Sequence, residues 1–383
     1  MVRPIWTALS IALLATTAES KNILWKVHFR EWFPQYDQVW TNLTTYNCSQ
    51  QYENYKHLDP PRNQINKYAA AMVKCLLGGA GEDLKANMIG AAVVLGLLPT
   101  LLGLVGSNTT ETGILTQFRP ILSILLTIGA PIVNPLRTFE NPIDPLELLK
   151  RRPKSRPFFG EETLRMSALI SATEYIAAFC AAVLTAYTTY QMWIRTITAF
   201  APDNEWLPWL WLSLALLVHA AGAYAMKQRV KVSWRKGLTT PNTKSKLGRL
   251  RIFFKREGTL CITAPAEGIS LKTETKRYIL MSWALPTGTV LYIIFGTMLF
   301  SSALFISTQD AVMVCSRYLA ATMLCRVIVM YELSGLRATI KLEDYEVVEP
   351  APHKIWPSVV TDADTEAYPL APYRTISPSF ETA

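Results

Sequence analysis

The amino-acid sequence predicts an all-α polytopic bundle of transmembrane helices. Half of the 383 residues are hydrophobic and 17% are charged, whereas about a quarter of the residues of a typical soluble domain carry charge. The apolar residues run continuously instead of alternating, which is typical of helices and not of barrel strands. About 20 helical residues cross the roughly 30 Å of bilayer hydrocarbon. Six apolar segments approach or exceed that length: 86–106, 114–133, 167–190, 206–226, 279–306 and 311–331.

The chain begins with a pattern typical of a secretory signal peptide at residues 1–18. Arg3 supplies a positive charge, an apolar stretch follows it, and small residues come next. An uncleaved first helix is the alternative. The following region, 19–85, is rich in Trp and Tyr and is predicted to be lumenal or extracellular. Its aromatic side chains are expected either in a small core or on the headgroup layer of the membrane.

Two covalent modifications are predicted in this region. The sequons Asn42-Leu-Thr and Asn47-Cys-Ser are N-glycosylation candidates if the segment is exported. Cys48 and Cys75 are the only cysteines of the region, and we expect a disulfide between them in an oxidising compartment.

The orientation of the bundle is predicted from its charges. The loop 227–278 holds fourteen Lys or Arg against three Glu, which places it in the cytosol and against the anionic inner leaflet. The net charge of +9 lies beside membrane segments, so nucleic acid is excluded as a partner. The tail 338–383 is acidic and rich in proline, and it is predicted to be disordered and cytosolic. The predicted location is the plasma membrane or another membrane of the secretory pathway.

The two segments 86–106 and 114–133 conflict with this orientation. If the signal is cleaved and both segments cross fully, the basic run before residue 167 lies outside. Either the first 20 residues remain as a helix, or one segment is re-entrant, or the basic run is an exception to the positive-inside rule. Pro99, Arg119-Pro120 and Pro131 interrupt these segments. We therefore favour a cleaved signal and an incomplete crossing.

Three ionisable residues inside the spans form the candidate site. Glu174, His219 and Arg326 lie at similar depths near the cytosolic ends of their helices. We expect a buried Glu174–Arg326 pair with His219 nearby, because a charge at membrane depth requires a partner. The favoured interpretation is a pair that fixes helix register, and the second is a cation-binding or proton-relay site. Glu332, just past the last span, is expected to be solvated.

No catalytic motif accompanies these residues. The sequence contains no GxxxxGK[ST], HExxH, GxSxG or GxGxxG, and no Cys/His cluster with metal spacing. We therefore predict no cofactor, metal or catalytic residue. A non-enzymatic scaffold, receptor-like or structural membrane protein is the first expectation. A small-solute or ion transporter using Glu174 and His219 is the second, and an enzyme is the third.

Two stretches resemble a known family. Residues 86–149, beginning ANMIGAAVVLGLLPTLLG, and residues 314–337, VCSRYLAATMLCRVIVMYELSGLR, are similar to an uncharacterised family of multi-pass integral membrane proteins of filamentous ascomycete fungi. The similarity covers most of the bundle and none of the tail. It implies a fungal membrane protein, and it supplies no substrate, activity or functional residue.

Overall fold

The computed structural model of this chain describes most of the bundle and of the region before it. The described residues are 27–57, 65–134, 166–202, 204–234, 253–254, 256–263, 266–339 and 341–342. They all belong to one compact unit. The expected signal peptide, the basic run before residue 167, residues 235–252 of the basic loop and the tail after 342 lie outside the described residues.

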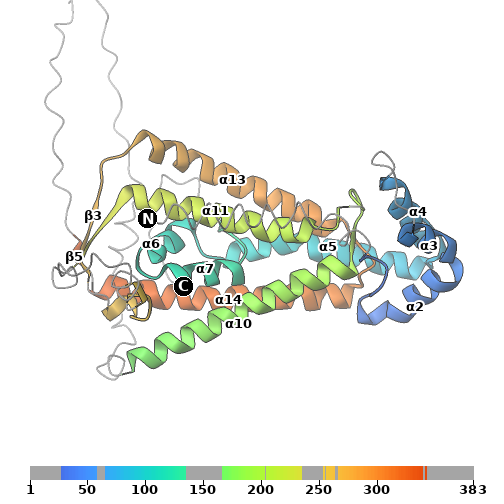
Figure 1. Ribbon diagram of the computed structural model, residues 1–383, viewed down its shortest axis with the longest axis horizontal. Coiled ribbons are helices and arrows are strands. Elements are labelled where there is room, and N and C mark those ends of the chain that lie inside the picture. The colour runs from blue at the N-terminus through green and yellow to red at the C-terminus, as the bar shows by residue number, and fades with distance from the viewer. Residues whose placement is uncertain are drawn as a thin grey trace, which may run out of the picture. The chain divides into compact units, whose positions relative to one another are not determined.

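The membrane-spanning part is a bundle of long apolar helices (Figure 1). Within the described residues, five helices are long and apolar enough to cross a bilayer: α5 (Glu82–Val105), α10 (Ser167–Arg195), α11 (Leu207–Arg229), α13 (Lys276–Ser301) and α14 (Thr308–Thr339). The predicted all-α membrane bundle is thereby confirmed. Pro99 does not interrupt α5, which continues through it to Val105. The expectation that this proline interrupts the segment is wrong.

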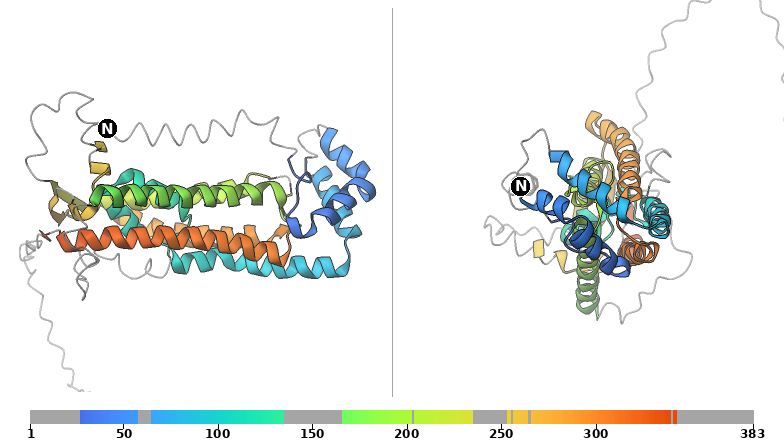
Figure 2. Two further views of the ribbon diagram at one scale, coloured as in Figure 1. Left: turned by 90° about the horizontal axis from the view of Figure 1, so that it is seen from below. Right: turned by 90° about the vertical axis from the view of Figure 1, so that its right-hand side faces the viewer.

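The segment 114–133 does not form a sixth span. It folds into two helices of 10 residues each, α6 (Thr109–Phe118) and α7 (Pro120–Gly129). They separate at Arg119 because the ring of Pro120 prevents the first helix from continuing. Figure 2 shows α5 along the half of the bundle next to the N-terminal helices, and α6 and α7 in the other half. We call α6, α7 and the residues joining them the hairpin.

Protein surrounds the hairpin. In α6, side chains on all sides are buried, including Thr109, Glu111 and Leu115. At Gly113, an added Cβ would lie 2.5 Å from Cγ of Met226 in α11, so a larger residue would push the two helices apart. Interrupted backbone at membrane depth is tolerated where it is enclosed by protein. This enclosure explains how an incomplete crossing is stable.

Two small sheets join helix ends at the two opposite ends of the bundle. β1 (Ile197–Thr198), after α10, pairs antiparallel with β4 (Ala303–Leu304), after α13. At the opposite end, β2 (Val230–Trp234) pairs antiparallel with β3 (Ala266–Leu271), and β3 pairs parallel with β5 (Lys341–Leu342). We call the second end the basic end, after the Lys and Arg residues around β2 and β3. Residues 338–339 end α14, and Lys341–Leu342 extend a sheet, so the prediction of a disordered tail from 338 is wrong for these residues.

The N-terminal helices lie at the β1–β4 end. They comprise a 3-10 turn (η3, Pro34–Tyr36), α2 (Asp37–Asn42), a π-helical turn (η4, Leu43–Asn47), α3 (Ser49–His57) and α4 (Ile65–Gly79). A disulfide joins Cys48 to Cys75, with their Cα atoms 6.0 Å apart. Asn42 and Asn47, the glycosylation candidates, are both exposed.

An aromatic core holds these helices to the bundle. Phe305, in the connection between α13 and α14, packs edge-on against Trp40 with ring centroids 4.9 Å apart, and against Trp32 at 5.3 Å. Phe29 and Tyr55 complete the cluster at 5.0 Å from each other. Of the two expectations for the aromatic residues, the small core is therefore the one that the structure supports. Phe29 and Phe305 both adopt positive φ, at 67° and 65°, a conformation that costs a residue other than glycine about 1–3 kcal/mol.

Candidate functional site

Arg119, at the turn of the hairpin, is the centre of a buried ionic cluster. Its side chain is fully buried, and all three guanidinium nitrogens donate hydrogen bonds. Nη1 donates to Oε2 of Glu174 and to Oε1 of Glu332, both at 2.5 Å. Nη2 donates to Oγ of Ser171 at 2.6 Å, and Nε donates to the carbonyl oxygen of Glu257 at 3.1 Å. This one cation therefore connects the hairpin to α10, to α14 and to the segment before β3.

Glu257 fixes the other side of the hairpin turn. Its Oε1 accepts a hydrogen bond from the backbone N–H of Leu122 at 2.9 Å and another from the Tyr175 hydroxyl at 2.6 Å. The Leu122 N–H lies in the first turn of α7, where helical N–H groups lack partners within the helix and where the helix dipole favours a carboxylate. Glu257 is one of the three glutamates of the basic loop 227–278. The structure buries it, at 4% exposure.

A second ion pair lies deeper in the bundle. Arg326 of α14 binds both carboxylate oxygens of Glu111 in α6, through Nη1 to Oε2 and through Nη2 to Oε1 at 3.2 Å. Glu111 also caps its own helix, because its Oε2 accepts from the N–H of Asn108 at 3.0 Å while the Asn108 side chain accepts from Thr110. The reciprocal arrangement is a capping box. The eight residues from Glu111 to Arg119 rise by about 12 Å, which separates this pair from the first cluster.

His219 forms a third contact with the hairpin. Its Nδ1 lies 3.0 Å from Oγ1 of Thr112, and its Nε2 lies 3.2 Å from the carbonyl oxygen of Ile132. A carbonyl oxygen only accepts, so Nε2 carries the proton and donates to Ile132, and Nδ1 accepts from the Thr112 hydroxyl. Both ring nitrogens are thus satisfied within the fold, and His219 has the surroundings of a structural core histidine.

These contacts correct the predicted pairing. Glu174 pairs with Arg119 and not with Arg326, whose partner is Glu111. His219 contacts neither Glu174 nor Arg326 in the hydrogen bonds of the described residues. The residues chosen from the sequence are buried as expected, but each of them binds the hairpin instead of another chosen residue.

Glu332 is a further correction. It was expected in water just past the last span, yet it is 2% exposed. Its Oε2 accepts from the backbone N–H of Cys261 at 2.9 Å, while its Oε1 accepts from Arg119. The reason is the length of α14, which continues to Thr339, and the packing of the 3-10 turn η7 (Cys261–Thr263) against it. The boundary of the apolar sequence is therefore not the boundary of the protein core.

The sequence did contain a signal for the missed partners. Arg119 interrupts an apolar run in the same way that Glu174 does, and a charge at membrane depth requires a partner. Asn108 and Glu111 have the three-residue spacing of a capping box. The three predicted residues lie in segments expected to span fully, so the prediction did not include the charges of the hairpin.

The chemistry available at these sites is limited. Among the described residues, no group of three or more His, Cys, Asp or Glu side chains is arranged to hold a metal ion. Burial, with the Glu332 carboxylate nearby, raises the pKa of the Cys261 thiol well above its usual range, so this thiol is not a thiolate nucleophile at neutral pH. Burial lowers the pKa of His28 to about 4, although a hydrogen bond with the backbone of Ile194 in α10 acts in the opposite direction.

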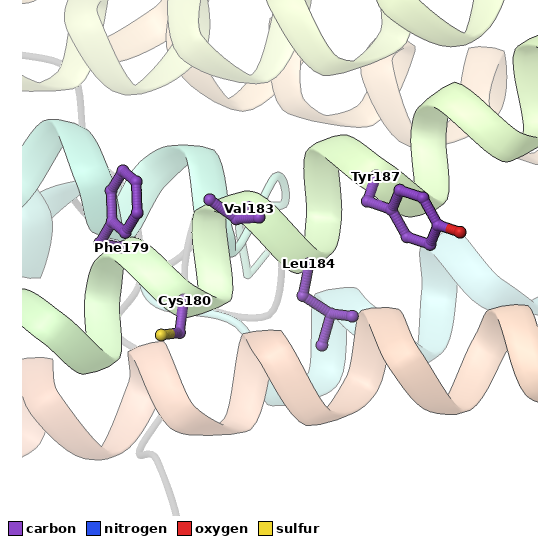
Figure 3. Close-up of a pocket in the computed structure, with 5 residues that line it drawn as sticks. All are labelled: Phe179, Cys180, Val183, Leu184 and Tyr187. Carbon is purple, nitrogen blue, oxygen red and sulfur yellow. The ribbon is translucent and has the colours of Figure 1, made fainter.

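Two hollows on the bundle surface are lined mainly by apolar side chains. One, of about 280 Å³, lies on α10 and is lined by Phe179, Cys180, Val183, Leu184 and Tyr187. Figure 3 shows that all five come from this one helix, so the hollow is a shallow depression on a helix surface. The other, of about 450 Å³, lies between α11 and α13. Neither hollow includes a residue of the ionic clusters.

Comparisons of the chain with protein-family models, with curated proteins and with solved structures find no match to it.

Proposed function

We propose that this membrane protein is non-enzymatic and that its bundle is a rigid scaffold with a receptor-like or structural role. One observation carries the proposal: the ionisable groups selected as the transport candidate are bound to the hairpin. Glu174 and His219 are each 6% exposed, and each is held by groups of the hairpin. A carboxylate that binds a moving cation or proton needs access to water, and this arrangement instead locks the helices in register.

The scaffold connects two surfaces of different chemistry. At the β1–β4 end, the N-terminal helices are tied down by the Cys48–Cys75 disulfide and by the aromatic core around Phe305. At the basic end, the three-stranded sheet joins the ends of α11, α13 and α14. A rigid bundle between two structured ends suits a protein that presents binding surfaces on both sides of a membrane.

The transporter remains the alternative function, and water access discriminates between the two. Cysteine at Thr322, whose side chain is fully buried in α14, or at Ser123 in α7, which is 4% exposed, would report water inside the bundle. We expect a charged, membrane-impermeant thiol reagent to leave both cysteines unmodified in reconstituted protein carrying Cys180→Ala, and to modify both after denaturation. Tyr46→Cys, at a side chain that is 77% exposed, is the positive control. Modification of either buried cysteine in the native protein would favour transport.

We further propose that the N-terminal helices are lumenal or extracellular and the basic end is cytosolic. The positive-inside rule supports this orientation, and so does the position of the N-terminal helices at the end opposite to β2, β3 and β5. In this orientation Asn42 and Asn47 can receive glycans. Glycosidase treatment should therefore increase the gel mobility of the secretory-pathway protein, and the Asn42→Gln/Asn47→Gln variant should migrate identically with and without the enzyme. Unchanged mobility of the wild-type protein would contradict the orientation or the use of both sequons.

A further inference from the structure

The hollow between α11 and α13 is a long apolar groove in the side of the bundle. Its volume is about 450 Å³. The lining residues are Leu214, Leu217, Val218, Ala221, Met281, Ala284, Leu285, Gly288, Leu291, Tyr292 and Phe295. Gly288 forms part of its wall, and a Cβ added there would meet no atom within 4 Å. The groove is therefore open space beside α13 and not a seam that side chains already fill.

The groove is long enough to hold an acyl chain across the hydrocarbon of one bilayer leaflet. From Met281 to Phe295 the helix rises by about 21 Å, and the hydrocarbon of one leaflet is about 15 Å thick. The groove begins five residues after Lys276, the first residue of α13 at the basic end. In Figure 1, α11 and α13 are farther apart near β3 than at their other ends. An acyl chain entering from the leaflet at the basic end would thus run along the groove.

The mouth of the groove is positively charged. Arg277 lies on the same face of α13 as Met281, Ala284 and Gly288, because residues at i, i+4, i+7 and i+11 share a helix face. Arg277, Lys276 and Lys227 are exposed, and within the described residues they make no ion pair. The neighbouring acid, Glu274, is paired with Arg229 at 3.2 Å. Free cations above an apolar groove complement a phosphate attached to an acyl chain.

We infer that this groove binds an anionic phospholipid from the leaflet at the basic end. One acyl chain lies against Gly288 between α11 and α13, and the headgroup phosphate faces Arg277, with Lys276 and Lys227 nearby. The two parts of the site have separate roles. The groove selects a hydrocarbon chain irrespective of its headgroup, and the cations select a negatively charged headgroup over a zwitterionic one.

Native mass spectrometry of the full chain, incubated with phosphatidylserine or phosphatidylcholine in detergent, tests both roles. We expect the wild-type protein to retain phosphatidylserine in preference to phosphatidylcholine. Gly288→Leu fills the groove and should weaken retention of both lipids by about tenfold or more, because hydrocarbon contact is lost. Lys276→Gln/Arg277→Gln should abolish the preference while phosphatidylcholine still binds.

Matched variants separate these effects from misfolding. Thr287→Leu places the same leucine side chain at the neighbouring exposed position of α13, outside the groove lining, and should bind lipid as the wild type does. Lys74→Gln removes an exposed cation from α4, at the other end of the protein, and should retain the preference. A Gly288→Leu protein that keeps its thermal stability and its bound lipid would overturn the inference. Equal retention of the two lipids by the wild type would overturn it as well. A wild-type dimer that Gly288→Leu dissociates would also overturn it, because the groove would then hold a second copy of the chain.

Discussion

Replacing Arg119 with methionine is expected to destabilise the bundle by about 3–5 kcal/mol, because removing one partner of a buried ion pair leaves uncompensated buried charge. The effect should be near the top of this range, since one guanidinium serves both Glu174 and Glu332. Methionine keeps much of the side-chain length and removes the charge. The measurement is the unfolding midpoint of the purified protein in detergent, followed by intrinsic tryptophan fluorescence.

Two further variants test whether charge is the cause. Arg119→Met/Glu174→Gln/Glu332→Gln removes the unpaired carboxylates, so it should recover a large part of the lost stability, since replacing a whole buried ion cluster is often nearly neutral. Arg326→Met is the matched control. Arg326 is 27% exposed and, among the described residues, pairs with Glu111 alone, so its loss should lower the midpoint less than the loss of Arg119. An Arg119→Met protein as stable as the Arg326→Met protein would contradict the central role of Arg119.

Phe305→Ala is expected to cost about 3–5 kcal/mol, the typical loss for truncating a buried phenylalanine. The side chain is 1% exposed and contacts Trp32 and Trp40. Its removal should loosen the N-terminal helices from the bundle before the bundle itself unfolds. Limited proteolysis of the reconstituted protein measures this effect, as faster cleavage within residues 27–81 with the bundle fragment intact.

A glycine variant tests the contribution of the backbone conformation at Phe305. Its φ of 65° is unfavourable for alanine and accessible to glycine. Phe305→Gly should therefore be less destabilised than Phe305→Ala, by about 1 kcal/mol, although glycine is ordinarily the more damaging substitution. If the glycine variant is cleaved faster than the alanine variant, the strain at this position does not contribute as inferred.

The spans of the bundle were predictable because their determinant is local. A continuous apolar run of helical length has one stable outcome in a bilayer, and 167–190, 206–226, 279–306 and 311–331 each correspond to a helix of the structure. The hairpin was predictable only as one of several alternatives. Pro120 indicates that a helix ends, but whether the chain then turns back depends on the space that α10, α11 and α14 leave around it.

The ion pairs were harder to predict for a different reason. Burial of Glu174, His219 and Arg326 follows from their positions in apolar segments. Alanines four, eight and twelve residues after Glu174, at 178, 182 and 186, indicate the face on which it packs. The partner of each residue depends on the rotation of whole helices and on the depth that the hairpin reaches. Neither quantity is encoded in the spacing of one helix, so the pairing of Glu174 with Arg119 became visible only in three dimensions.

The order of synthesis determines when the ion pairs of the hairpin can form. Arg119 is synthesised 213 residues before Glu332, and Glu111 is synthesised 215 residues before Arg326. At roughly 5–20 residues per second, the ribosome needs about 10–40 s to cover this interval. During that time Glu111 lacks its partner in α14, and Arg119 has Glu174 of α10 but lacks Glu332. An unpaired charge in hydrocarbon is costly. We therefore expect the hairpin to stay sheltered, by the insertion machinery or at the membrane surface, until α14 enters. On this view, assembly of the described bundle is completed only when α14 enters.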